Sequence, residues 1–375
     1  MKIKPIVVAV ATTLLPYCSV YAAALDRSGQ SIAAFLQPGN YVEAGLTVLD
    51  PTVKGQDASG HQVSDMADDY YFPSAALKVQ ATEQISLGLI YDQPFGADST
   101  YAIDGSDFSN PQSSTEVKVR TNNITALIGY QPTERWNVYA GPVWQTVAAD
   151  IETKGTAYKS LNGYHIVVDQ EQAYGWITGV AYQIPEIALK ASVTYRSEIT
   201  HNANSVETSL LPFPGYDYSA GITQAVTPQS LNVELQTGIA ANTLAFANLR
   251  WVHWDQFVVT PPLLKKVGQN LIAYSDDQYS ITSGLSHKFN DQWAATAAVG
   301  YDSGAGNPVT TLGPTDGYWS VGLGGQYSPT AQSFIQAGVK YFWLGDATAQ
   351  TGGYNVAEFK NNYALGYGLK IGHRF

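Results

Sequence analysis

Histidine is scattered through this sequence, although it is the side chain that most often serves as a general base or metal ligand near neutral pH. The six histidines stand at positions 61, 165, 201, 253, 287 and 373, without the spacing of a metal-binding motif. His253 and Asp255 are the best candidates for a hydrolytic site, since a nucleophile could come from another strand. We favour a structural role for this pair. The sequence therefore predicts no catalytic residue, no metal and no cofactor.

Charged residues at alternate positions of several segments form a second candidate site. If these segments are strands, every second side chain points to the same face. One face then carries Lys78, Lys118, Arg120, Lys190, Arg196, Glu198 and Lys340, and Arg250 joins them where the alternation is less regular. Such charges either pair with one another, as Arg196 and Glu198 would, or offer a cation to an anionic ligand. For the second reading we select as ligand-binding candidates Arg196, Lys190, Lys118, Arg120 and Arg250.

Three of the long connections between these segments contain apolar clusters. They are residues 166 to 168, residues 210 to 213 with Tyr216 and Tyr218, and residues 257 to 259 with Leu263 and Leu264. Exposed apolar patches mark binding sites for hydrophobic ligands or partners, whereas the same residues could simply pack on each other. The candidate contacts for a hydrophobic ligand are Leu211, Phe213, Tyr216, Phe257 and Leu263.

The composition indicates a protein that faces lipid without helical spans. Charged residues make up 14% of the chain, against about 25% in soluble proteins. A spanning helix requires a run of about twenty apolar residues, and the sequence contains no such run. A membrane β-barrel resolves this, because each strand shows lipid only every second residue. The 25 tyrosines and 8 tryptophans fit the aromatic rings that collect at both membrane interfaces.

The N-terminus has the pattern of a secretory signal peptide. Lys2 and Lys4 precede an apolar stretch over residues 6 to 15, and small residues follow at 22 to 24, where we expect cleavage. We assign residues 1 to 24 to this peptide. The only cysteine, Cys18, lies within it, so the mature chain is expected to hold no disulfide. The net charge of −11 makes nucleic acid an unsuitable partner.

Segments of alternating polarity recur through the rest of the chain and predict spanning strands. They lie near residues 41 to 49, 75 to 81, 85 to 91, 117 to 130, 136 to 147, 172 to 183, 187 to 199, 230 to 239, 244 to 257, 277 to 289, 293 to 302, 318 to 327, 333 to 343 and 361 to 375. These fourteen segments predict an all-β protein, a transmembrane antiparallel barrel of the bacterial outer-membrane type over residues 40 to 375.

The connections alternate between short turns and long polar loops, which predicts the topology. Short turns belong on the periplasmic side and long loops outside, so both termini are expected in the periplasm. The last strand ends in Phe375, as outer-membrane barrels commonly do, and this ending resembles the assembly signal read by the barrel-insertion machinery. The expected partners are that machinery, outer-membrane lipids with lipopolysaccharide, and a hydrophobic small molecule. We expect a monomer.

A family resemblance rests on several segments taken in order. Residues 40 to 55 read NYVEAGLTVLDPTVKG, residues 194 to 199 read TYRSEI, residues 254 to 257 read WDQF, Tyr301-Asp302-Ser303 stands before Pro308, and Trp319, Gly322 and Tyr327 follow. Together they resemble the long-chain fatty acid outer-membrane transporters, the FadL-like family, whose barrels have the same number of strands. TYRSEI is the most specific of these segments, and the resemblance extends from about residue 40 to the C-terminus.

The resemblance implies diffusion of long-chain fatty acids or other hydrophobic molecules through the barrel. It also implies a lateral way out through a kink in the third strand, where Gly88 is the residue best suited to a bulge. Family members carry a longer N-terminal plug with an Asn-Pro-Ala motif. Here residues 25 to 39 form only a short plug segment and lack that motif. The alternative function is a surface adhesin or receptor whose apolar outer loops bind a host or environmental molecule.

Overall fold

The computed structural model of this protein describes residues 25–211 and 215–375. The signal peptide expected over residues 1 to 24, and the candidate residue Phe213, therefore lie outside the described residues. None of the helices in the described part is long and apolar enough to cross a membrane.

Fourteen antiparallel strands form a closed barrel, as the alternation predicts. The first strand, β1 (Tyr41–Thr52), pairs with both its neighbour β4 and the last strand β24, which closes the wall. The other strands, in order around the wall, are β4 (Tyr70–Gln80), β5 (Ile85–Asp92), β7 (Glu116–Thr133), β8 (Trp136–Glu152), β9 (His165–Ile184), β10 (Leu189–Arg196), β13 (Ser230–Ala240), β14 (Thr243–Val252), β17 (Gln278–Lys288), β18 (Trp293–Asp302), β20 (Tyr318–Tyr327), β21 (Ser333–Leu344) and β24 (Tyr363–Arg374).

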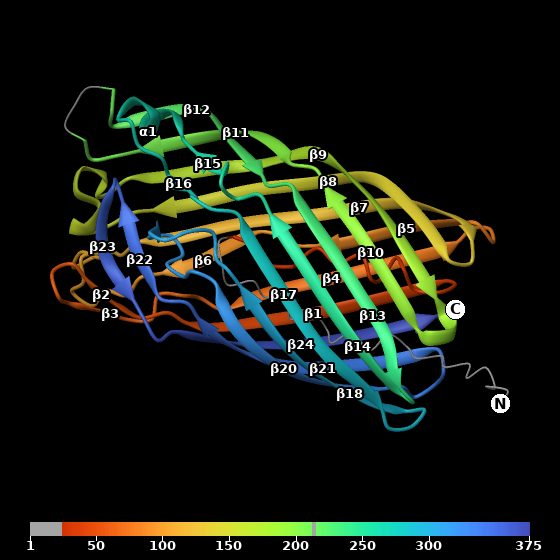
Figure 1. Ribbon diagram of the computed structural model, residues 1–375. Coiled ribbons are helices and arrows are strands. Elements are labelled where there is room, and N and C mark those ends of the chain that lie inside the picture. Colours follow the sequence, from red (N-terminus) through yellow and green to blue (C-terminus); the bar gives the residue numbers. More distant parts are fainter. Residues whose placement is uncertain (1–24, 212–214) are drawn as a thin grey trace, which may run out of the picture.

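Figure 1 shows the barrel lengthwise, with short turns and the C-terminus at one end and the long loops at the other. One of the short turns, between β9 and β10, contains the short 3₁₀ helix η2 (Pro185–Ile187). The outer loops carry a five-stranded sheet made of β2 (Gly55–Asp57), β3 (Gln62–Val63), β19 (Val309–Thr310), β22 (Ala347–Thr351) and β23 (Tyr354–Phe359). The remaining outer elements are β6 (Gly96–Thr100), η1 (Thr156–Leu161), β11 (Ile199–Thr208), β12 (Tyr218–Thr227), β15 (Val258–Val259), α1 (Pro262–Lys266) and β16 (Ile272–Ala273).

The outer surface of the wall is apolar and bordered by aromatic rings. Leu87, Ile128 and Leu369 are about half exposed there, as lipid-facing side chains should be. Rings from neighbouring strands contact each other near both ends of the barrel, with centroids 4.7 Å apart for Trp136 and Tyr182 and 4.8 Å apart for Tyr301 and Trp319. These pairs match the two aromatic belts expected at the membrane interfaces.

The outer half of the barrel is filled by its own loops. One apolar cluster lies beneath the five-stranded sheet and includes Phe108, Tyr158 and Phe342. Burial raises the pKa of Tyr158, in η1, to about 12. A second cluster, described below, lies deeper and includes Trp254. The long loops thus fold inward and pack on each other in the lumen, although their polar sequences suggested solvated connections.

Deleting Phe375 should lower the amount of protein inserted in the outer membrane. The ring is 60% exposed at the barrel end, and the residue adds one further hydrogen bond, from its backbone N–H to the Asn40 carbonyl. Its loss removes the terminal aromatic group but little packing. Immunoblotting of membrane fractions at high expression measures the effect, and unchanged levels would contradict the assembly role.

Candidate functional site

The plug segment, residues 25 to 39, lies inside the barrel and is held by a buried ion pair. Asp26 accepts a hydrogen bond from Nε of Arg250 on β14 at 2.7 Å, and both side chains are almost fully buried. The other nitrogens of Arg250 donate to Gln30 of the plug and to Asn232 on β13. Asn232 in turn donates to the carbonyl of Gly29. Arg250 therefore does face the lumen, and it is committed to holding the plug.

The second half of the plug is fixed by one ring and two lysines. Phe35 is 1% exposed and packs edge-on against Tyr139, with centroids 5.8 Å apart. Lys78 donates to the carbonyl of Gln37 at 2.6 Å, and Lys190 to the carbonyl of Leu36 at 2.7 Å. The two lysines thus cap backbone groups of the plug from opposite walls of the barrel.

Gly88 has a different role from the one expected. It lies inside a regular part of β5, paired with Lys78 on one side and Leu127 on the other, so no bulge occurs there. A Cβ at this position would stand 2.4 Å from the Phe35 ring. The same ring lies against Gly129 on β7, where an added Cβ would stand 2.9 Å from the ring. The glycine is required because the plug approaches the wall closely, which corrects its assignment as the site of the kink.

Arg196 lies at the end of β10 and is 5% exposed. Its Nη1 donates to the Thr125 hydroxyl and its Nη2 to the Gln30 carbonyl, while its buried Nε has no hydrogen-bond partner. Within residues 25–211 and 215–375 no carboxylate lies within 4.0 Å of it. The pairing with Glu198 considered from the sequence is wrong, because the strand breaks at Ser197 and Glu198 and leaves Glu198 exposed.

Two other cations selected from the sequence lie on the outside of the barrel. The side chains of Lys118 and Arg120 are 49% and 53% exposed and pair with Glu116 and Asp98. The inward face of this part of β7 consists of Val117, Val119 and Thr121. The prediction failed because it assumed that every charge on a strand avoids lipid. The outer end of β7 extends past the aromatic belt, where an outward charge faces water or lipid head groups.

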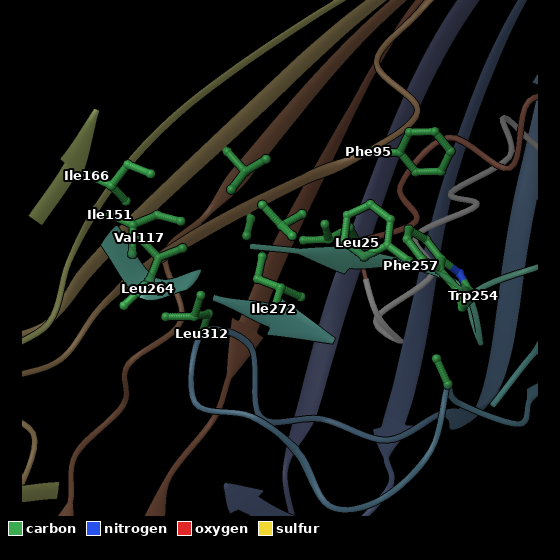
Figure 2. Packing of buried hydrophobic residues seen from close by; sticks show 14 of the residues in the cluster. Leu25, Phe95, Val117, Ile151, Ile166, Trp254, Phe257, Leu264, Ile272 and Leu312 are labelled. Atoms are coloured by element: carbon green, nitrogen blue, oxygen red, sulfur yellow. The ribbon is translucent and has the colours of Figure 1, made fainter. Parts of the chain in front are cut away.

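The apolar loop residues form a buried cluster in the mouth of the barrel (Figure 2). Phe257 is 6% exposed, Leu263 is fully buried, and Ile166 is fully buried as well. Trp254 lies between Phe95 and Phe257, with ring centroids 5.6 and 5.2 Å away. The chain from Trp254 to Phe257, expected to continue a strand, turns inward here. The expected apolar outer surface is therefore mostly a core, in which loops pack on each other.

A smaller apolar group stays at the outer surface. Leu210 is 74% exposed and Leu211 is half-buried. Tyr216 is half-buried, with the ammonium group of Lys266 5.9 Å from the centre of its ring. These residues belong to the connection between β11 and β12, of which residues 212–214 are not described.

The wall is interrupted in its third strand. Pairing between β4 and β5 ends at Ala75 and Tyr91, and resumes further out as a single bridge between Ala67 and Ser99. Between these points the chain at residues 93 to 95 leaves the wall. Phe95 turns into the lumen, where it is 4% exposed and bridges to Asp26 of the plug. Among the described strands, residues 70 to 74 of β4 have no ladder partner on this side, and only the Tyr70 hydroxyl reaches the backbone of Asp98 in β6. We call this opening the wall window.

The register explains the interruption. Asp92 pairs with Asn123 and Gly96 pairs with Arg120, so the third strand has one residue more than β7 over this stretch. An extra residue unpairs the ladder locally and bends the strand. Pro94 adds to this, because it has no N–H to donate. The signal was present in the sequence as Gln-Pro-Phe after an apolar strand, but it was assigned to a loop.

A cavity of about 110 Å³ connects the plug to the wall window. It is lined by plug residues such as Arg27 and Ala34, by Tyr41 on β1, and by Ser74 and Gln93 at the window. Arg27 lies over the ring of Tyr70, 4.6 Å from its centre. The cavity thus reaches the lipid-facing wall at the point where the strands part.

Two groups of histidine and aspartate come together in the outer loops, although they are dispersed in sequence. They are His253 with Asp255 and Asp277, and His61 with Asp57 and Asp107. Asp277 accepts hydrogen bonds from His253 and from the Trp251 ring nitrogen. Asp57 likewise accepts from His61 and from backbone N–H groups. The described contacts of both groups brace the loops.

A closed barrel with an internal plug, an apolar mouth and an opening in its wall is the architecture of an outer-membrane channel. The chain belongs to the outer membrane protein transport protein family (OMPP1/FadL/TodX), whose model matches residues 23–375. The FadL-like resemblance read from the sequence is thereby confirmed. The protein is an outer-membrane protein of a family of channels for hydrophobic compounds.

Solved structures of the same fold are similar over nearly the whole chain. A FadL homologue from Pseudomonas aeruginosa has a TM-score of 0.71 at 15% identity, with 92% of each chain covered. The toluene transporter TodX of P. putida scores 0.63 at 15% identity, with 91% of each chain covered. The toluene transporter TbuX of Ralstonia pickettii scores 0.64 at 13% identity, covering 96% of this chain and 98% of the other. No curated protein matches in sequence.

Proposed function

We propose that this protein lets hydrophobic small molecules, long-chain fatty acids among them, diffuse across the outer membrane without chemical change. The wall window carries the proposal, because a cavity beside the plug leads to an opening in the apolar wall. The free energy of a hydrophobic molecule is lower in lipid than in water, so an exit into the bilayer is favourable. The similarity of the fold to a toluene transporter and to a FadL homologue supports a hydrophobic cargo.

The entry side of the route is the apolar cluster around Trp254. Its members close the mouth tightly, so a ligand must displace loop side chains or the start of the plug, where Leu25 joins the cluster. The burial of Phe257 and Leu263 also argues against the adhesin alternative, because the exposed apolar surface that it needs is small. Cleavage of the signal peptide before the plug is part of this proposal.

Uptake by cells tests the function. A deletion strain should take up labelled oleate and labelled toluene more slowly than the parent, and a plasmid copy should restore uptake. Normal uptake of both compounds by the deletion strain, with no other member of the family present, would contradict the proposal. Hydrolysis of an ester substrate by the purified protein would show that it also performs chemistry.

Arg196 is the candidate contact for the carboxylate of a fatty acid. Its guanidinium is buried, lacks a carboxylate partner among the described residues and retains an unused donor at Nε. Arg196→Gln should slow the uptake of oleate, since a charge-assisted contact is worth about 1.5 to 3 kcal/mol, roughly ten- to hundredfold in affinity. Uptake of an uncharged hydrophobe of similar length should be unchanged.

The outward-facing Arg120→Gln variant is the matched control, because it loses a guanidinium from the wall but not from the lumen. Equal loss of both compounds in Arg196→Gln, or of neither, at normal barrel levels would show that Arg196 only holds Gln30 of the plug.

A further inference from the structure

The cavity beside the plug is separated from a second cavity by a thin partition. The second cavity, of about 380 Å³, lies among the periplasmic turns after β17 and β20, and we call it the periplasmic vestibule. Phe334 lines both cavities. Gln336 on the first side donates to Gln326 on the second at 2.7 Å. Arg374 on the vestibule side donates from Nη2 to Gln37 of the plug at 3.0 Å.

The partition therefore includes the Phe334 ring and two side-chain hydrogen bonds. None of these contacts belongs to a strand ladder, so they can separate without breaking the wall. Gln37 is a plug residue, which means that the partition and the plug share a contact. On the vestibule side, the small residues Ser286, Ala294 and Ser333 leave the space that the cavity occupies.

Arg374 is the cation of the vestibule that no carboxylate neutralises. It is half-buried, its Nε is buried without a hydrogen-bond partner, and no carboxylate of the described chain lies within 4.0 Å of it. The other cation that lines the cavity, Lys288, is paired with Asp291 at 2.7 Å. Ser286, Ser328 and Thr330 add neutral hydroxyl groups to the lining.

We propose that the periplasmic vestibule is a binding site for the carboxylate of an amphiphile, with Arg374 as its cation, and that it gives the barrel an exit into the periplasm. This rests on the proposed function. A carboxylate forms a stronger, charge-assisted hydrogen bond with a guanidinium than the neutral amide of Gln37 does. A bound acid therefore takes Arg374 from Gln37, which opens the partition and frees one contact of the plug. Hydrocarbons without a charge lack this exchange and leave by the wall window.

A site-specific label tests the proposal. Ala331 lines the vestibule and is exposed, and the natural sequence has no cysteine outside its first 24 residues. Ala331→Cys in the purified protein should react with a maleimide, and oleate should slow this reaction while methyl oleate does not. A cysteine at the exposed turn residue Glu83, outside the vestibule, should be unaffected by either compound.

Two substitutions in the Ala331→Cys protein assign the cation. Arg374→Gln should remove the protection and weaken oleate binding to the vestibule about tenfold or more, whereas Lys288→Gln should change neither. Oleate binding that leaves the labelling rate unchanged would overturn the vestibule site but leave the proposed function standing. Equal protection by oleate and methyl oleate, or protection that survives Arg374→Gln, would overturn the role of Arg374. A protein that binds no oleate at all would contradict both proposals.

Discussion

Replacing Arg250 with methionine should release the plug from the barrel. Asp26 is then left as a fully buried carboxylate without its partner, and breaking a buried ion pair in this way costs about 3 to 5 kcal/mol. Gln30 and Asn232 also lose their hydrogen bonds to the guanidinium. The contacts with Asp26 and Gln30 join the plug to the wall, and the contact with Asn232 joins the side chains of β13 and β14. Because none of them is a backbone hydrogen bond of the ladder, the barrel should still assemble.

Two measurements detect the release of the plug. Tryptic cleavage after Arg27, which is 7% exposed in the intact structure, should become faster by about a hundredfold or more, as this loss of free energy implies. The conductance of single channels in planar bilayers should rise as the lumen clears. Arg120→Met is the control, since it breaks an ion pair of comparable form on the outer surface and should change neither quantity.

A double variant separates the charge from the shape. Asp26→Leu combined with Arg250→Met removes both charges, so no unpaired carboxylate remains, and most of the protection of Arg27 should return. If the Arg250→Met protein keeps its plug as firmly as the natural one, the ion pair is not what holds it. The plug is then held by its other contacts, among them the packing of Phe35 and the hydrogen bonds from Lys78 and Lys190.

A short plug suffices here because the barrel is filled from both ends. The plug occupies the part of the lumen between Lys78 and Lys190. The loops around Trp254 and those beneath the five-stranded sheet occupy the mouth. A plug of this length can therefore contribute to gating, because the loops close the part of the lumen that it leaves open. The parts to be moved are the plug and the inward-folded loops, and the wall window needs no movement of its own.

The strands were predictable because lipid imposes a strict alternation on them, whereas the site depends on features that alternation does not record. Lys118 and Arg120 alternate as lumen residues would, but they lie beyond the bilayer, where the rule has no force. Phe257 and Leu263 are apolar in a loop, and sequence alone cannot say whether such a loop folds outward or inward.

Gly88 and Arg250 show what only the packed structure reveals. Gly88 suggested a bulge, yet its missing side chain makes room for Phe35, some fifty residues earlier in the chain. Arg250 was placed in the lumen by its register, but its partner Asp26 lies 224 residues away. Pairings at such separations leave no local pattern. The wall window was likewise hidden, because it depends on counting residues against β7.

That count leads to the prediction with the largest expected effect on transport. Deleting Pro94 removes the one extra residue, so Gln93 can pair opposite Asn122 and Phe95 opposite Thr121 in an unbroken ladder. The side chains then alternate correctly from Asp92 through Phe95, both of which already face inward. The third strand can run straight beside residues 70 to 74 of β4, and the wall window should close.

Uptake of labelled toluene by cells carrying this deletion should fall close to the level of a strain without the protein. Pro94→Ala is the matched control, because it restores an N–H but keeps the extra residue and therefore the window. It also keeps the carbonyl that accepts the hydrogen bond from Arg27, so it tests for loss of that plug contact. Both proteins should reach the outer membrane in normal amounts. Full uptake by the deletion variant, with the ladder shown to be closed, would mean that hydrophobic molecules leave the barrel elsewhere. The periplasmic vestibule would then be the route to examine, because its partition does not involve the third strand.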